Sequence, residues 1–257
     1  MGKFDGRVAV ITGGASGIGR ETAKLFAKEG ANVVITTSRN WDGLIETVKM
    51  VEELGGSALP VLADASSEAD WDKTVEQAIE KYGKINYLIN NAGRRPFGGV
   101  ESATMENLLD AFKYDCFSVF IGMNRCVPYM RKVRENGEEA AIVNVTSFTA
   151  KAGAPEYLCY VSAKAATIAM TKCAAADLCD TGIRVNTLLP GLIDTPIIQD
   201  RPKKDLDGFV DQFMVKRKGL PEEIAAGIIY LCSDEAKYVD AAELTIDGGF
   251  TGTRSYK

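Results

Sequence analysis

The chain reads RVAVITGGASGIG over residues 7–19, and this stretch decides the fold. Its apolar and β-branched first half predicts a buried strand over 7–12. Gly13, Gly17 and Gly19 then permit a tight turn, and a helical pattern follows over 18–30. Such a turn lets the backbone approach a pyrophosphate, to which the helix N-terminus offers N–H groups. The same glycines would also suit a turn that binds nothing.

Outward from this stretch, short apolar runs alternate with helical patterns. The further predicted strands lie at 32–36, 58–63, 86–90, 141–146, 184–190 and 243–247, and the further helices at 41–54, 68–82, 104–132, 155–180 and 221–233. Apolar strands that alternate with helices indicate a parallel sheet covered on both faces. We therefore predict an α/β fold, a single doubly wound (Rossmann) sheet of about seven strands with helices on both faces.

The domain organisation follows from the unbroken alternation. No linker, repeat or low-complexity stretch interrupts it, so we predict a single domain over 1–257. Residues 194–219 are the exception, because they are polar, charged and weakly periodic. We expect this segment to form a lid over the substrate.

Composition narrows the function classes. Of 257 residues, 46% are hydrophobic and 25% charged, as in a globular protein, and the net charge of −5 argues against nucleic acid or an anionic membrane as partner. The sequence shows no secretory pattern and no spanning segment, and its six cysteines form no C-x-x-C pair, so we expect a cytoplasmic protein with reduced thiols. With no histidine, Ser-His and Cys-His catalysis are excluded and we expect no metal site.

The glycine spacing differs from G-x-G-x-x-G and resembles the T-G-x-x-x-G-x-G of the short-chain dehydrogenase/reductase family. Further motifs of that family follow in order: N-N-A-G at 90–93, Ser147, Y-x-x-x-K at 160–164, P-G-L-I-D-T at 190–195 and D-G-G at 247–249. The resemblance spans about residues 6–250. It implies an oxidoreductase that interconverts a ketone and a secondary alcohol by hydride transfer with NADP or NAD.

The residues themselves suit that chemistry. Ketone reduction needs a proton donor at the oxygen, and in a chain without histidine Tyr160 is a credible one, although a phenol has an ordinary pKa of about 10. Lys164, one helical turn later, supplies a positive charge that lowers this pKa. Ser147 follows a strand and can hydrogen-bond the substrate oxygen. Taken singly, the tyrosine and the lysine would suit an ordinary helix surface equally well.

The resemblance also implies a set of dinucleotide-binding residues. It comprises the glycine turn, the ends of the second and third strands, the N-A-G segment, the tyrosine–lysine pair and the residues from Pro190 on: Gly13, Ser16, Gly17, Ile18, Gly19, Ser38, Arg39, Asp64, Ala65, Asn91, Ala92, Gly93, Tyr160, Lys164, Pro190, Gly191, Ile193 and Thr195. No carboxylate follows the second strand, where Ser38 and Arg39 could bind a 2′-phosphate, so we favour NADP. Ser16 stands where many NADP-dependent members carry a basic residue, which leaves NAD open.

One position departs from the family pattern. The family places an asparagine 25 residues after the first Asn of N-N-A-G, and this chain has Asp115 there. An ionised aspartate accepts hydrogen bonds but donates none, and its charge would oppose the effect of Lys164 on Tyr160. Asp115 is therefore a catalytic candidate in an altered proton relay, or the mark of a weakened or specialised enzyme. The second interpretation leaves open a dinucleotide-binding sensor or scaffold with little turnover.

The partner we expect is a small molecule. Aromatic and apolar candidates suit a ring-bearing or hydrophobic substrate, although each could instead pack the lid onto the body: Phe97, Phe148, Tyr157, Leu192, Phe209, Phe213 and Met214. Basic candidates would attract an acidic substrate or lie in solvent: Arg94, Arg95, Arg201, Lys203 and Lys204. The family resemblance also implies a homo-oligomer, a tetramer built through the long helices and the 221–247 segment.

Overall fold

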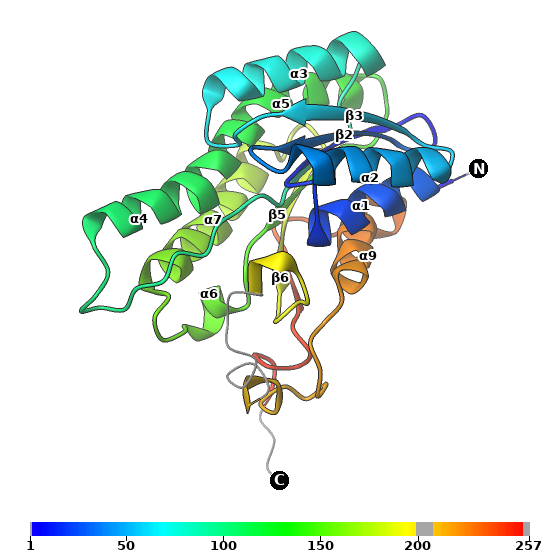
Figure 1. Ribbon diagram of the computed structural model, residues 1–257. Helices are drawn as coiled ribbons and strands as arrows, with labels where there is room; N and C mark the ends of the chain where they lie inside the picture. The colour runs from blue at the N-terminus through cyan, green and yellow to red at the C-terminus, as the bar shows by residue number, and fades with distance from the viewer. Residues whose placement is uncertain (1, 199–207, 254–257) are drawn as a thin grey trace.

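Seven parallel strands form the centre of the computed structural model, which describes residues 2–198 and 208–253. The strands lie in the order β3-β2-β1-β4-β5-β6-β7 (Figure 1). They are β1 (Val8–Thr12), β2 (Asn32–Thr37), β3 (Ser57–Leu62), β4 (Tyr87–Asn90), β5 (Ala141–Val145), β6 (Arg184–Pro190) and β7 (Glu243–Ile246). Every pairing between neighbours is parallel. The predicted doubly wound α/β sheet is confirmed.

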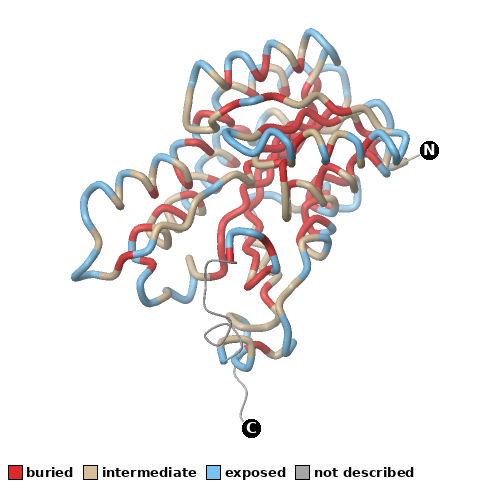
Figure 2. The backbone as a smooth tube through the Cα atoms, in the orientation of Figure 1, coloured by how far each residue is buried: buried red, intermediate tan, exposed pale blue. Residues whose placement is uncertain are grey.

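Two layers of helices bury the sheet. The first layer holds α1 (Gly17–Lys28), α2 (Trp41–Glu53) and α9 (Pro221–Cys232), and the second holds α3 (Glu68–Tyr82), α5 (Ser118–Glu135) and α7 (Leu158–Asp177) (Figure 1). Strands β1, β5 and β6 are buried at every position, as parallel strands between two helical layers must be. The buried residues run through the sheet and along the helix sides that face it (Figure 2).

The strand order reverses at the middle of the sheet, where β1 lies between β2 and β4. Connections on the two sides of this point leave in opposite directions and open a crevice at the carboxyl ends of the strands. Thr12 ties these ends together, because its hydroxyl accepts hydrogen bonds from the amides of Asn91 (3.0 Å) and Ala92 (2.9 Å). The Asn91 side chain in turn donates to the Thr12 carbonyl at 2.9 Å.

The helix predicted over 104–132 is not continuous. It consists of α4 (Met105–Phe112), a π-helical turn at Lys113–Phe117 and then α5, which ends at Glu135. The Thr167 hydroxyl on α7 donates a 2.8 Å hydrogen bond to the carbonyl of Asp115, inside the widened turn. A π turn costs regular helical hydrogen bonds, and this contact compensates for part of that loss.

The helix predicted over 155–180 begins three residues late. Pro155 does not open it, because Glu156 adopts a left-handed φ of +64° that no α-helix accommodates, so α7 starts at Leu158. A short helix, α6 (Thr149–Ala152), precedes this turn and was not predicted. The consequence is a compact loop between β5 and α7 that lies beside the crevice.

The segment predicted as a lid is joined at its base. Ile193 pairs with Gly219, and the Gly219 amide donates to the Leu192 carbonyl at 2.9 Å. Its described parts contribute Phe209 and Phe213 to an aromatic cluster with Phe148 and Phe250. Residues 199–207, with Arg201, Lys203 and Lys204, lie outside the described residues. Among the described helices, none combines the length and hydropathy that crossing a membrane requires.

A buried amide pair offers a test of how β4 and β5 are held. Asn90 donates to the Asn144 side-chain oxygen at 2.9 Å, and Asn144 donates to the Thr171 hydroxyl at 2.9 Å. Asn144→Leu leaves the Asn90 amide without this acceptor, so we expect the free energy of unfolding in urea to fall by about 1–3 kcal/mol. The control is Asn136→Leu at an exposed helix end. Equal stability of the two variants would contradict this role.

Candidate functional site

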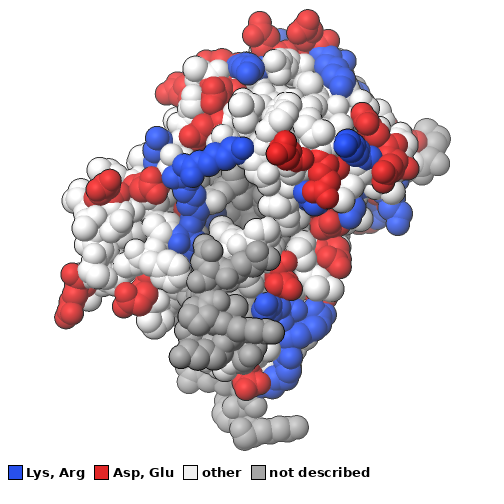
Figure 3. Space-filling model, in the orientation of Figure 1, with Lys and Arg blue, Asp and Glu red and all other residues white. Residues whose placement is uncertain are grey.

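A cavity of about 650 Å³ lies at the carboxyl ends of the strands. Figure 3 shows this hollow with a row of basic side chains along one rim. Every residue of the predicted dinucleotide and catalytic sets lines it, apart from Gly19 and Arg39. The sequence motifs, far apart in the chain, therefore meet in one place. The size is that of an ordinary ligand pocket.

The glycine turn borders the cavity where α1 begins. Gly17, at a φ of +52°, lines the cavity with Ile18 at the helix start, so the unpaired N–H groups of the first turn are at its wall. Gly19 does not line it, because its role is close packing: a Cβ there would lie 2.2 Å from the Gly13 carbonyl oxygen. This donor set and its close backbone approach fit the phosphates of a dinucleotide.

The other end of the predicted dinucleotide site lies at the ends of β2 and β3. Thr37 and Ser38 line the cavity, while the neighbouring Arg39 is exposed beside it. Asp64 accepts hydrogen bonds from the Ser66 amide (2.9 Å) and hydroxyl (2.7 Å). Partial burial acts to raise the pKa of Asp64, but these hydrogen bonds, together with the charges of Lys113 and Arg94, outweigh it and the pKa is lowered. Asp64 is thus held as an oriented carboxylate.

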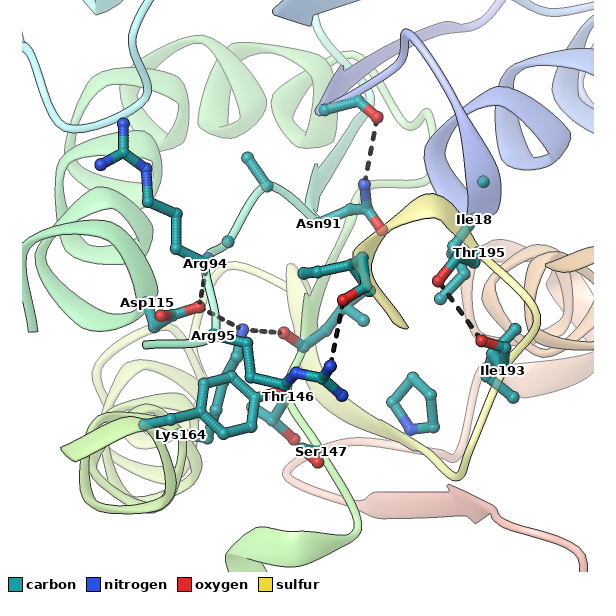
Figure 4. A pocket seen from close by; sticks show the side chains of 18 of the residues that line it. Ile18, Asn91, Arg94, Arg95, Asp115, Thr146, Ser147, Lys164, Ile193 and Thr195 are labelled. Carbon is teal, nitrogen blue, oxygen red and sulfur yellow. Dashed lines mark hydrogen bonds and ion pairs between the residues drawn. The ribbon is translucent and has the colours of Figure 1, made fainter. Parts of the chain in front are cut away.

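Ser147, Tyr160 and Lys164 all line this cavity. Figure 4 shows Ser147 and Lys164. The Ser147 oxygen lies 2.8 Å from the Thr149 hydroxyl and accepts the Thr149 amide at 3.2 Å, which orients it just after β5. Lys164 donates to the Val145 carbonyl at 3.1 Å, and its ammonium lies 5.9 Å from the centre of the Tyr160 ring. The predicted sharing of one helix face by Tyr160 and Lys164 is thus found in the structure.

Asp115 forms a direct, buried ion pair with Lys164. Its Oδ1 lies 3.1 Å from Nζ, and the two side chains are 0% and 5% exposed (Figure 4). Oδ1 also accepts the Arg94 amide at 3.2 Å, whereas Oδ2 has no hydrogen-bond partner among the described residues. Burial raises the pKa of Asp115 although Lys164 acts to lower it. Burial acts to lower the pKa of Lys164, but the Asp115 carboxylate reverses this and the pKa is raised.

The pKa of the Tyr160 phenol is raised, whereas the sequence argument from Lys164 alone predicted that it would be lowered. Burial raises the pKa of Tyr160 above its ordinary value. Lys164 opposes that rise, Asp115 adds to it, and Ser147 and Arg95 oppose it more weakly. The carboxylate of Asp115 therefore opposes the effect of the cation that should favour the phenolate.

Several lining residues were missed or left open by sequence reasoning. Thr149, which holds Ser147, could have been found from its two-residue spacing, a common serine/threonine turn. Arg95, weighed only as a basic loop residue, donates to the Ile197 carbonyl at 3.1 Å and lies 5.3 Å from the Tyr157 ring centre. Arg94 stacks on Tyr114, with 3.4 Å from its guanidinium carbon to the ring centre, an arrangement that no local signal predicts.

Four of the seven apolar candidates line the cavity, whereas Phe213, Met214 and the half-exposed Phe97 do not. Those that line the cavity are Phe148, Tyr157, Leu192 and Phe209. Phe213 is instead buried against Phe148 and Phe250, which agrees with the alternative that it packs the lid onto the body. The cavity thus has a polar wall at the glycine turn and an aromatic wall formed by Phe148, Tyr157 and Phe209.

The chain is similar to several known oxidoreductases over nearly its whole length. A family model described as enoyl-(acyl carrier protein) reductase matches residues 13–251. The chain is 36% identical to 2,5-dichloro-2,5-cyclohexadiene-1,4-diol dehydrogenase LinX of Sphingobium indicum, over 97% of this chain and 98% of that protein. It is 37% identical to 3-oxoacyl-[acyl-carrier-protein] reductase FabG of Thermotoga maritima, over 96% and 98%. A 7α-hydroxysteroid dehydrogenase solved with NADH and 7-oxo glycochenodeoxycholic acid superposes with a TM-score of 0.91, at 32% identity over 99% and 97%.

The close packing at Gly19 can be tested by adding one methyl group. Gly19→Ala forces the Gly13 carbonyl away and distorts the turn, so we expect dinucleotide affinity to fall about tenfold or more in calorimetric titration. The matched control is Gly252→Ala, where a Cβ meets nothing within 4 Å. If both variants bound the dinucleotide equally well and melted at the wild-type temperature, this turn would not be the phosphate site.

Proposed function

The chain belongs to the short-chain dehydrogenase/reductase family, an oxidoreductase family with members that act on alcohols and ketones. From this premise we propose that it interconverts a ketone and a secondary alcohol on a small, ring-bearing or hydrophobic molecule, with NADP(H) as the preferred dinucleotide. The observation that carries the proposal is the convergence of Ser147, Tyr160 and Lys164 on one cavity, beside the glycine turn.

In the proposed reaction the dinucleotide exchanges the hydride, and the side chains transfer the proton and stabilise charge. A nicotinamide held in this cavity would supply the hydride to the carbonyl carbon in reduction and accept it in oxidation. Tyr160 donates its phenolic proton to the carbonyl oxygen in reduction and takes the hydroxyl proton in oxidation. Ser147, fixed by Thr149, hydrogen-bonds the same oxygen and stabilises charge that develops on it. Lys164 fixes the polar environment of the phenol and offers its remaining N–H donor to the dinucleotide ribose.

The substrate class is proposed from the aromatic wall. Phe148, Tyr157 and Phe209 line the cavity near the catalytic serine, and flat apolar surfaces of this kind suit a ring-bearing ketone. Two of the similar proteins are named for cyclic alcohols, a cyclohexadiene diol and a hydroxysteroid, which supports this choice. The residues described for 194–219 add Phe209 to this wall, which supports their proposed role as a substrate lid within a single catalytic domain.

The coenzyme preference is proposed from the end of β2. Thr37 and Ser38 present hydroxyls to the cavity, and Arg39 follows them at its edge, so a 2′-phosphate would meet donors and a positive charge. The similar hydroxysteroid dehydrogenase was solved with NADH, so the proposal of NADP rests on the residues of this chain and not on that relative.

We also propose a homotetramer. Four large apolar side chains in this region are about half exposed: Leu109 on α4, Phe117 in the π turn, Phe120 on α5 and Leu158 on α7. Exposed apolar side chains of this kind suit contact with a second copy of the chain.

Catalysis is tested with NADPH or NADH absorbance against steroid, cyclic, sugar-derived and acyl-thioester ketones. Tyr160→Phe should lower kcat by about 10²- to 10⁴-fold with dinucleotide affinity retained, because only the proton is lost. Tyr157→Phe, beside it in the cavity, should keep activity within a few-fold. Dinucleotide binding with no turnover on the whole panel would instead support a sensor or scaffold.

Coenzyme choice is tested separately by removing one charge. Arg39→Ala should weaken NADPH binding about tenfold or more and leave NADH binding unchanged, because only the 2′-phosphate loses its partner. Lys49→Ala, which removes the same charge from an exposed site on α2, is the control. Equal loss for both dinucleotides, or no loss for either, would refute the NADP preference.

A further inference from the structure

The ion pair between Asp115 and Lys164 has a consequence that does not depend on which partner carries the proton. Two groups that share a proton at this distance titrate as a unit. Whether written as carboxylate and ammonium or as carboxylic acid and amine, the Asp115–Lys164 unit has a net charge of zero. An asparagine at the same position would leave a net charge of +1 beside Tyr160.

The charged groups around the pair do not remove this difference in net charge between aspartate and asparagine at position 115. On the π turn the Cys116 thiol acts on Lys164, and on α4 the Asp110 carboxylate acts on Asp115. Asp110 itself lies 3.8 Å from the Arg94 guanidinium. The π turn also carries Lys113 and Tyr114. From the loop after β4, Arg94 turns its amide toward Asp115, and Arg95 acts on Tyr160 from the lid side of the cavity. The Arg94 amide, which contacts Asp115 directly at 3.2 Å, carries no net charge.

The fold fixes the pair rigidly. Asp115 sits in the π turn, whose carbonyl is held by Thr167, and Lys164 is held by the Val145 carbonyl. Both side chains are buried, so solvent screens their interaction little. The Asp115 side chain also has no room to move away from Lys164 toward the N-A-G loop, because even a Cβ on Gly93 would lie 2.4 Å from the Asp115 oxygen.

We propose that Asp115 is a positioning residue that sets the working pH of the site: by cancelling the charge of Lys164, it keeps the Tyr160 phenol protonated to higher pH than an asparagine would. This inference rests on the proposed function, in which Tyr160 exchanges the proton. The protonated phenol is the form that reduction needs, whereas oxidation needs the phenolate. The site is therefore set for ketone reduction at neutral pH, and its alcohol oxidation requires alkaline solution.

The test is the pH dependence of Asp115→Asn in both directions, on the substrate pair found with the panel. The rise of the oxidation rate with pH should move to lower pH, so that at about pH 7 the rate, relative to its alkaline plateau, exceeds the wild-type value by about threefold or more. The reduction rate should begin to fall at lower pH than in the wild type. Asp110→Asn removes a nearby but half-exposed carboxylate and should leave both profiles in place.

A spectroscopic titration makes the result independent of turnover. Ionisation of the tyrosines of the dinucleotide-free protein is followed by ultraviolet absorbance, and subtracting the matched Tyr160→Phe protein isolates Tyr160 from the nine tyrosines. The phenol should ionise at lower pH with Asp115→Asn, or with Asp115→Ser should the first variant not fold. An unmoved or alkaline-shifted ionisation, or rates reduced equally at every pH, would overturn the inference. A moved ionisation with no turnover of any substrate would uphold it and refute the proposed function.

Discussion

The parallel sheet places one constraint on everything else: all seven strands present their carboxyl ends on the same side, and the order reverses beside β1. Side chains far apart in sequence can meet only there. Thr12 joins the two central ends through the Asn91 and Ala92 amides, so the glycine turn and the N-A-G loop form adjoining parts of one cavity wall. The backbone pairing of β1 with β4 and these side-chain hydrogen bonds together fix the two loops relative to one another.

The sequence was a good guide wherever structure depends on local pattern. Buried apolar strands are recognised by composition, and glycines at a strand–helix junction restrict the turn to few conformations, so the sheet and the glycine turn were predicted correctly. The pattern also brought Ser147, Tyr160 and Lys164 together, because strand ends and helical spacing determine their place. Gly19 shows the limit: the motif includes it, but only three-dimensional packing separates a residue that supports the turn from one that lines the cavity.

What the sequence could not predict depends on contacts between distant elements. The residues of 104–132 have a helical pattern throughout, and the π turn is favoured by the Thr167 hydroxyl on another helix, which takes the Asp115 carbonyl. The start of α7 is likewise set by a left-handed Glu156 that no propensity scale indicates. Arg94 and Arg95 are basic loop residues in sequence, and only the fold stacks one on Tyr114 and joins the other to Ile197.

Asp115 was partly predictable from the sequence and partly dependent on contacts between distant elements. The sequence identifies the position and the change from asparagine, but aspartate and asparagine have nearly the same shape, so pattern alone cannot tell whether the charge matters. That depends on distance and burial, and the structure supplies both: a 3.1 Å contact with Lys164, with both side chains buried. A buried ion pair contributes little to stability after desolvation, because the energy of removing two charges from water offsets their attraction. Its lasting effect is on the third group nearby, the phenol of Tyr160, which lies next to a pair with no net charge.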